Sequence, residues 1–239
     1  ATQTEVEEQV DLMYSLIHQQ VDAIVLVPID SKALVQPVVE AVRKGVPVIN
    51  IDIRLDTQLL EQAGVEVAFV GPDNFAAAYE VGKLLDKKLR NEDKVAIIEG
   101  LTAADNAQRR KRGFIKAIEE KGLRLVASEP ADWETEKAAE VFQAMWMRYP
   151  DLKAVYCSND AMALGVLQQM QEKNCYLPVV GFDNDAVMKE FLSTGKLVAT
   201  ADIFSSQMAV RGIEFALDVL EGKIENRGVH STAYEIIKQ

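Results

Sequence analysis

Val155-Tyr-Cys-Ser-Asn-Asp-Ala-Met-Ala-Leu-Gly165, together with Val179-Val-Gly-Phe-Asp183 further along, says most about the fold of this chain. Each segment has the form of a short apolar strand that ends at polar residues and is followed by a helix. The polar residues are Asn159, Asp160 and Asp183. Open α/β sheets bind ligands at the carboxyl ends of their strands, where such side chains converge. Either these residues build a small-molecule site, or Asp160 and Asp183 only cap the helices that follow, a role common for Asp.

Short apolar runs alternate with helical patterns almost from end to end, which predicts an α/β fold with parallel, doubly wound sheets. Most runs are continuously apolar, as expected for strands covered on both faces. We expect one helix to use Ser31 as its N-cap, with Pro37 kinking it or delaying its start. The expected strands are 23–27, 46–51, 67–70, 94–98, 124–128, 154–157, 179–181 and 198–201. The expected helices are 4–18, 32–45, 74–89, 106–121, 134–148, 161–173, 186–193 and 205–221.

The composition argues against several classes of function. A net charge of −11 and a pI near 4.8 disfavour nucleic acid or an anionic membrane as a partner. No apolar run is long enough for direct membrane insertion. The two histidines, His18 and His230, lie far apart, which argues against a His-based metal or catalytic site. The sequence contains no glycine-rich phosphate motif and no Gly-x-Ser-x-Gly elbow. We therefore expect a binding protein without a cofactor, and not an enzyme.

Six segments together point to one known family. In chain order they are Val21–Ser31, Gly45–Asp52, Gly71–Asn74, Asn106–Phe114, Ser158–Gly165 and Val180–Asp183. They resemble the periplasmic sugar-binding proteins of the ribose-binding type and the related LacI-type effector domains. The resemblance covers essentially the whole chain, and it is more specific for the family than for the ligand.

The resemblance implies a type I periplasmic-binding-protein fold, in which two Rossmann-like lobes with parallel doubly wound sheets are joined by a hinge and close over a sugar. On this chain the N-terminal lobe would comprise 1–91 plus 204–228, and the C-terminal lobe 92–203 plus 229–239. The polar run Lys87–Asp93 fits a lead-in to the second lobe.

The resemblance also implies a set of ligand-binding residues. Asp52 matches a carboxylate that accepts sugar hydroxyls, and Trp133 an aromatic that stacks on the apolar face of the sugar. Asn159 and Asp183 match hydroxyl-binding groups, and Arg110 matches the arginine of an Arg-x-x-Gly-Phe motif. Such groups suit sugars, which need charge-assisted hydrogen bonds and an aromatic plate. Each has a structural alternative: Asp52 as a turn residue, Trp133 as a packing residue and Arg110 as a structural arginine.

Some positions depart from the ribose-type pattern. Gln108 stands where the pattern has an arginine, and Ile203 where it has a glutamine. A different sugar, a sugar acid, a polyol or a furanose-like signalling molecule is therefore as good a candidate as ribose. Arg54 comes one residue later than the arginine that follows the Asp in the pattern. Because one residue reverses the side-chain direction in an extended chain, Arg54 either reaches the site by another backbone path or points away. Asn106 either only caps its helix or contributes to the site, since the loop that carries it faces the cleft in relatives.

The N-terminal lobe is expected to be incomplete. Family members begin with a strand, a helix and a second strand before the helix expected at 4–18, and this sequence has no such unit. If no other chain supplies those strands, Ala23–Val27 becomes an exposed apolar edge that invites pairing. We expect the chain alone to bind its ligand weakly or to dimerise.

Two functions follow from the resemblance. The first is a periplasmic or otherwise extracytoplasmic solute-binding protein that closes over a sugar or polyol and delivers it to an ABC-type membrane permease. The second is a ligand-sensing domain of a transcription regulator, or of a membrane receptor, chemoreceptor or kinase system. An enzyme on the same frame is disfavoured because the catalytic residues are lacking.

Overall fold

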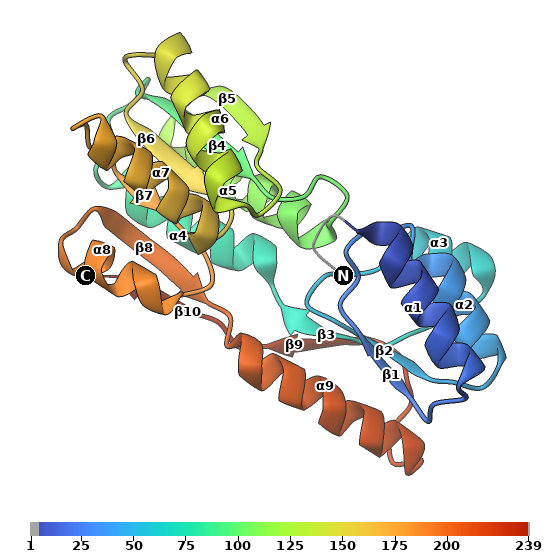
Figure 1. Cartoon of the computed structure of the whole chain (residues 1–239). Coiled ribbons are helices and arrows are strands. Elements are labelled where there is room, and N and C mark those ends of the chain that lie inside the picture. The colour runs from blue at the N-terminus through green and yellow to red at the C-terminus, as the bar shows by residue number, and fades with distance from the viewer. Residues whose placement is uncertain (1–4, 239) are drawn as a thin grey trace. The chain divides into compact units, whose positions relative to one another are not determined.

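The computed structural model describes residues 5–238 and separates into two units, each assembled from segments distant in the sequence (Figure 1). Unit 1 contains the segment that ends at Pro72, together with Ala103–Asn106 and Phe204–Ala233. Unit 2 contains Asp73–Thr102, Ala107–Ile203 and the segment that starts at Tyr234. The α/β class with mainly parallel sheets, expected from the alternation, is confirmed.

The units differ in extent from the two lobes expected from the sequence. The N-terminal lobe was expected to run to residue 91, whereas residues 73–91 group with unit 2. The reason is that helix α4 (Asn74–Asp86) packs on strands β8 (Leu197–Asp202) and β7 (Val179–Val180) of unit 2. The second difference lies at 229–233, which group with unit 1 because strand β9 (Val229–Thr232) pairs with a strand of that unit.

Unit 1 is a parallel four-stranded sheet between helices. The strand order is β1-β2-β3-β9, and every pair is parallel. Helices α1 and α2 build the larger apolar core on one side, while α9 packs on β1, β2 and β3. The new elements of this unit are β1 (Ile24–Leu26), β2 (Val48–Ile51), β3 (Phe69–Pro72), α1 (Val6–His18), α2 (Val35–Arg43), α3 (Thr57–Ala63) and α9 (Ser205–Leu220).

The start of α2 agrees with the expected effect of Pro37 but not with the expected N-cap. The helix begins at Val35, so Pro37 lies in the first turn, where its missing N–H costs no hydrogen bond. Ser31 was expected to be the N-cap, and this is wrong. Its hydroxyl instead accepts a hydrogen bond from the Asp105 backbone N–H at 2.9 Å. Asp30 takes the turn-forming role, because its Oδ1 accepts from the backbone N–H groups of Lys32 and Ala33.

Among residues 5–238, no strand pairs with the outer side of β1, and this border of unit 1 is apolar. Strand β1 is the outer strand of the sheet, as expected for 23–27, and its side chains Val25 and Val27 are exposed. Helix α9 buries one stripe against the sheet (Met208, Gly212 and Ala216). A second stripe on α9, with about half of each side chain exposed, consists of Val210, Ile213, Leu217 and Leu220. The open edge and this stripe lie close together, since the Cβ position of Gly212 is 3.1 Å from Val25 Cγ1.

Unit 2 is a six-stranded sheet in the order β10-β8-β7-β6-β4-β5. All pairs are parallel except β10 with β8, which are antiparallel. The central strands are fully buried, and helices cover both faces (Figure 1). The remaining elements are β4 (Lys94–Glu99), β5 (Arg124–Pro130), β6 (Ala154–Cys157), β10 (Glu235–Lys238), α5 (Asp105–Lys121), α6 (Thr135–Arg148), α7 (Asp160–Glu172), η1 (Ala186–Met188) and α8 (Lys189–Ser193).

Candidate functional site

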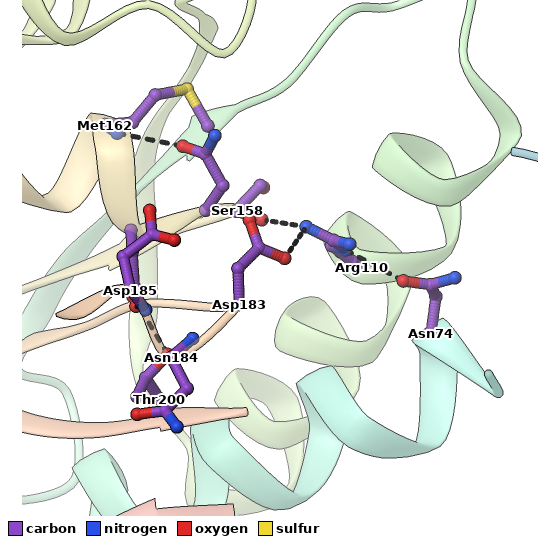
Figure 2. A network of polar contacts seen from close by, with 10 residues as sticks. Asn74, Arg110, Ser158, Met162, Asp183, Asn184, Asp185 and Thr200 are labelled. Carbon is purple, nitrogen blue, oxygen red and sulfur yellow. Dashed lines mark hydrogen bonds and ion pairs between the residues drawn. The ribbon is translucent and has the colours of Figure 1, made fainter. Parts of the chain in front are cut away.

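A buried arginine lies at the centre of the polar cluster in unit 2. Arg110, on α5, is only 3% exposed, and its Nε donates to Asn74 Oδ1 at 2.8 Å. Its Nη1 donates to the backbone carbonyl of Ser158 at 2.7 Å and lies 3.4 Å from Asp183 Oδ1 (Figure 2). A buried guanidinium requires such partners, because an unpaired buried charge is very costly. Asn74, Ser158 and Asp183 therefore fix Arg110 from three elements.

Aromatic rings flank the same arginine. The Arg110 guanidinium carbon lies 3.7 Å from the centroid of the Phe182 ring and 5.4 Å from that of Trp133. Guanidinium groups stack favourably on aromatic faces. Two residues expected in the site from the sequence, Arg110 and Asp183, are thus in direct contact, and Trp133 lies next to them.

Trp133 is held by an unusual backbone and a glycine. Asp132 and Trp133, in the loop between β5 and α6, have positive φ angles of 51° and 69°. The indole occupies the space where Gly100 lacks a side chain, since a Cβ there would be 2.1 Å from the ring. Ordinary side chains do not approach this closely, so a residue larger than glycine at position 100 would displace the indole. The side chain of Lys137 on α6 pairs with Asp132 in this loop.

Asn159 and Asp183 end neighbouring parallel strands. Asn159 is the N-cap of α7, and its Oδ1 accepts from the Met162 backbone N–H at 2.8 Å. The alternative that Asp160 and Asp183 are only N-caps is wrong. Asp160 is the first residue inside α7, and Asp183 lies in the loop before η1, whose N-cap is Asp185.

Burial perturbs two titratable groups behind the cluster. Asp160 is fully buried, and this desolvation raises the pKa of its carboxyl to about 7. The pKa of the Cys157 thiol, at the end of β6, is also raised well above its ordinary value, chiefly by burial and then by the charge of Asp160. A buried carboxylate beside a polar cluster is a common attribute of functional sites.

The start of α5 carries two further expected residues. Asn106 is the second residue of α5, so the alternative that it caps this helix is wrong. It is buried, and its Oδ1 has no hydrogen-bond partner. Buried polar atoms are normally satisfied, which makes this oxygen a candidate for a ligand contact. Gln108 is half-buried, and its Nε2 donates to the carbonyl of Thr102 at 3.0 Å, so it supports the loop before α5.

Unit 1 presents a separate pair of charged residues at the end of β2. Asp52 has a positive φ of 60°, and its Oδ1 is buried. Arg54 lies over the Phe69 ring at 5.4 Å. The turn at Asp52 interrupts strand alternation. That Arg54 reaches a ligand by this path stays a prediction. The buried Asn50 fixes this turn, since its side chain bonds the backbones of Leu26, Ile53 and Leu55.

Sequence reasoning missed three residues that hold the cluster together. Asn74, Ser158 and Phe182 each contact Arg110. All three belong to segments that carry the family resemblance, but nothing in their residue types indicates that they meet one arginine. The Ser158 side-chain Oγ is buried without a hydrogen-bond partner. The contacts become visible only when β6, β7, α4 and α5 are placed in space.

Two kinds of feature are lacking within residues 5–238. Over that range no helix combines the length and apolar character that crossing a bilayer requires. The same part of the chain holds no cluster of three or more His, Cys, Asp or Glu side chains arranged for a metal ion.

Comparison with known proteins identifies the family. A model of the periplasmic binding protein domain matches residues 1–224. The D-ribose/D-allose-binding protein of Pseudomonas aeruginosa is 40% identical over 240 residues, which cover 98% of this chain and 75% of that protein. The D-allose-binding periplasmic protein of Escherichia coli K12 is 33% identical over 217 residues, which cover 89% of this chain and 70% of that protein.

Solved structures agree with the sequence relatives. An ABC transporter solute binding protein from Burkholderia multivorans, with an unknown ligand represented as α-D-erythrofuranose, matches with a TM-score of 0.94 at 39% identity, over 99% of this chain and 84% of its own. A periplasmic solute binding protein from Actinobacillus succinogenes with bound D-allose matches with a TM-score of 0.90 at 31% identity, over 98% of this chain and 84% of its own. The chain therefore belongs to the periplasmic binding protein family, within the ribose-binding type that its sequence resembles.

Proposed function

We propose that this chain binds a neutral sugar or polyol and delivers it to an ABC-type permease outside the cytoplasm. The observation that carries the proposal is the pair of the buried Arg110 and the partly exposed Asp183 in unit 2, whose Nη1 and Oδ1 atoms lie 3.4 Å apart, with Trp133 beside Arg110. A guanidinium, a carboxylate and an indole are the groups that recognise the hydroxyls and the apolar face of a sugar. Asn159 adds a carboxamide. Its Oδ1 accepts a hydrogen bond in the cap of α7, and its Nδ2 can donate to a hydroxyl of the ligand.

The charge balance of this cluster favours a neutral ligand. Asp183 neutralises Arg110, so the pair offers no net positive charge to a sugar acid. In unit 1, Asp52 and Arg54 repeat the combination of one carboxylate and one guanidinium. The curated relatives are named for binding D-ribose or D-allose, and the Actinobacillus succinogenes protein holds D-allose, which supports an uncharged sugar.

The binding proposal predicts ligand-dependent stability. D-ribose, D-allose, a polyol and a sugar acid would each be added during thermal unfolding, with calorimetric titration of any hit. A sugar at about a hundred times its Kd should add roughly 2.7 kcal/mol to the unfolding free energy, or about 5–11 °C in Tm for a chain of this size, at about 2–4 °C per kcal/mol. Asp183→Asn should abolish the shift, because it removes the negative charge beside Arg110 while keeping the side-chain shape.

The matched control is Asp185→Asn, which makes the same change at an exposed position two residues away. It should retain the shift. A panel in which only the sugar acid stabilises the protein would contradict a neutral ligand, and a panel without any stabilising sugar would contradict the proposal as a whole.

Delivery to a permease is supported by the ABC transporter context of the solved relatives. It is tested by adding the sugar-loaded protein to a reconstituted permease and measuring ATP hydrolysis, which should rise only with the loaded form. The alternative, a sensing domain of a regulator or of a receptor or kinase system, predicts no stimulation.

A further inference from the structure

The loop that carries Asp183 has a backbone that needs external support. Asp183 has a φ of 109° and Asn184 a φ of 60°, both in the positive region that residues with a side chain rarely adopt. Such a conformation persists only where its surroundings determine it. The position of the Asp183 carboxylate beside Arg110 therefore depends on the contacts that hold residues 183–185.

Those contacts come from β8 and from α7. The Asp183 backbone N–H donates to the Ala201 carbonyl at 2.7 Å, and the Asn184 backbone N–H donates to Thr200 Oγ1 at 3.2 Å. The Asn184 side-chain Nδ2 donates to Asp202 Oδ2 at 2.9 Å. The third residue of the loop, Asp185, donates its backbone N–H to Asp160 Oδ2 at 2.9 Å.

Asp160 connects these contacts with one another. Its other oxygen, Oδ1, accepts from the Thr200 hydroxyl at 2.9 Å, and its own backbone N–H donates to the Phe182 carbonyl at 2.7 Å. It also follows Asn159 directly at the start of α7. The carboxylate fits closely against β7, because a Cβ on Gly181 would lie 2.0 Å from Asp160 Oδ1. Both of its oxygens thus accept from groups that shape the loop.

We infer that Asp160 is a positioning residue, which does not touch the sugar but holds the Asp183 loop and the start of α7 in the geometry that binds it. The expected effect of Asp160 on sugar affinity rests on the proposed function. The support that Asp160 provides to residues 183–185 does not depend on any ligand.

The charge state of Asp160 gives the role a pH signature. Both donors match the carboxylate, and a proton on either oxygen would oppose one of them. Burial raises the pKa of this carboxyl to about 7, so it titrates in an accessible range. The titratable groups that interact with it are Asp185 in the loop and Cys157 on β6. The other charged groups on the elements that hold the loop are Asp202, which accepts from Asn184, and Asp183 with its partner Arg110. We expect the affinity for sugar to fall as the pH drops below about 7.

Stability should change with pH in the opposite direction. The pKa of Asp160 is higher in the folded protein than its ordinary value of 3.8, so the folded state binds this proton more tightly than the unfolded state. The unfolding free energy therefore falls as the pH rises from about 4 to about 7. Asp160→Asn, which cannot titrate, should remove this part of the slope.

The test compares Asp160→Ala, Asp160→Asn and Thr200→Val with the control Asp185→Asn. Calorimetric titrations with D-ribose and D-allose would be run from acid to alkaline pH. We expect Asp160→Ala to weaken binding by about tenfold or more, the effect of losing hydrogen bonds to a charged group. Thr200→Val should weaken it less, and Asp160→Asn should bind with an affinity that no longer depends on pH in this range. Asp185→Asn should keep a pH-dependent affinity whose midpoint lies at lower pH, because the charge of Asp185 contributes to the raised pKa of Asp160.

Amide hydrogen exchange without ligand provides the second readout. The Asp185 amide should exchange faster in Asp160→Ala than in the wild-type protein, while the amides of β4 and α6 keep their protection. Unchanged exchange at residues 183–185, or a wild-type pH profile in Asp160→Asn, would overturn the inference. Absence of sugar binding in the wild-type protein would instead overturn the proposed function, and the exchange result would still decide the role of Asp160.

Discussion

At the scale of single residues, the cluster in unit 2 depends on small residues as much as on charged ones. Arg110 and Asp183 supply the polar contact, but the indole of Trp133 reaches its place only because position 100 is glycine. The indole fills the space that a Cβ would take, and the left-handed backbone of Trp133 directs it there. Neither the glycine at position 100 nor the left-handed backbone of Trp133 can be recognised in the sequence as part of a binding site.

Gly100→Ala tests this steric dependence. The new Cβ would lie 2.1 Å from the Trp133 ring, so the indole must move and both stability and sugar affinity should fall. Overpacking of this kind costs about 1–3 kcal/mol. Urea unfolding measures the stability, and calorimetric titration with D-allose measures the affinity.

The control is a double-mutant cycle with Trp133→Leu. If the clash with the indole is the cause, Gly100→Ala should cost much less stability in the Trp133→Leu background than in the wild-type protein. Equal costs in the two backgrounds would show that Gly100 matters for another reason.

The sequence was sufficient to predict several residues of the site, but not the contacts that hold them in place. Asp183 and Arg110 were expected because strand-end carboxylates and the Arg-x-x-Gly-Phe motif stand out. Asn74 and Ser158 could not be assigned in this way, because each bonds Arg110 across 36 or 48 residues of sequence. Such contacts depend on the three-dimensional packing of helices on the sheet, which local patterns do not record.

At the scale of elements, the expected strands and helices were found, including the short stretch 186–193 that forms η1 and α8, but three further elements were not foreseen. All eight expected strands are present as β1 to β8, and most of them are buried apolar runs, whereas the residues of β5 are exposed or half-buried. No comparable pattern indicated β9 and β10, whose side chains are exposed or half-buried except for Thr232, or the seven-residue helix α3. The antiparallel pairing of β10 with β8 is the corresponding departure from an all-parallel sheet.

Helix α4 offers a prediction at this scale. Its N-cap, Asp73, accepts from the backbone N–H groups of Phe75 and Ala76, both at 3.1 Å. Asp73→Ala should lower the unfolding free energy by about 1 kcal/mol, because the first turn of the helix loses its cap. Asp73→Ser keeps a capping oxygen and should cost clearly less in the same urea unfolding experiment. Equal losses in the two variants would mean that Asp73 acts through its charge.

At the scale of the whole molecule, the open border of unit 1 has consequences for solution behaviour. Strand β1 combines an outer position in its sheet with the exposed side chains of Val25 and Val27, and α9 exposes Ile213 and Leu217 nearby. Exposed apolar edges favour pairing between copies. The chain covers 75% and 70% of the two curated relatives, which are longer proteins.

We therefore predict that this chain self-associates as its concentration rises. Val25→Lys and Ile213→Glu should each shift the mass measured by light scattering after gel filtration toward the monomer, because a charge on an edge or an apolar stripe opposes pairing. Met147→Lys makes a similar change at an isolated, 70% exposed residue of α6 in unit 2 and should have no effect. A wild-type chain that remains monomeric with full sugar affinity would contradict the prediction.

The adjacency of β9 and β10 in the sequence bears on how the protein is made. Strand β9 completes the sheet of unit 1 beside β3, and β10 completes that of unit 2 beside β8. During translation, domains generally fold as units from the N-terminus onward. Here neither sheet can be finished until residues 229–238 have left the ribosome. The sheets of both units therefore depend on the same late segment for completion. If translation stops before residue 229, both sheets stay incomplete.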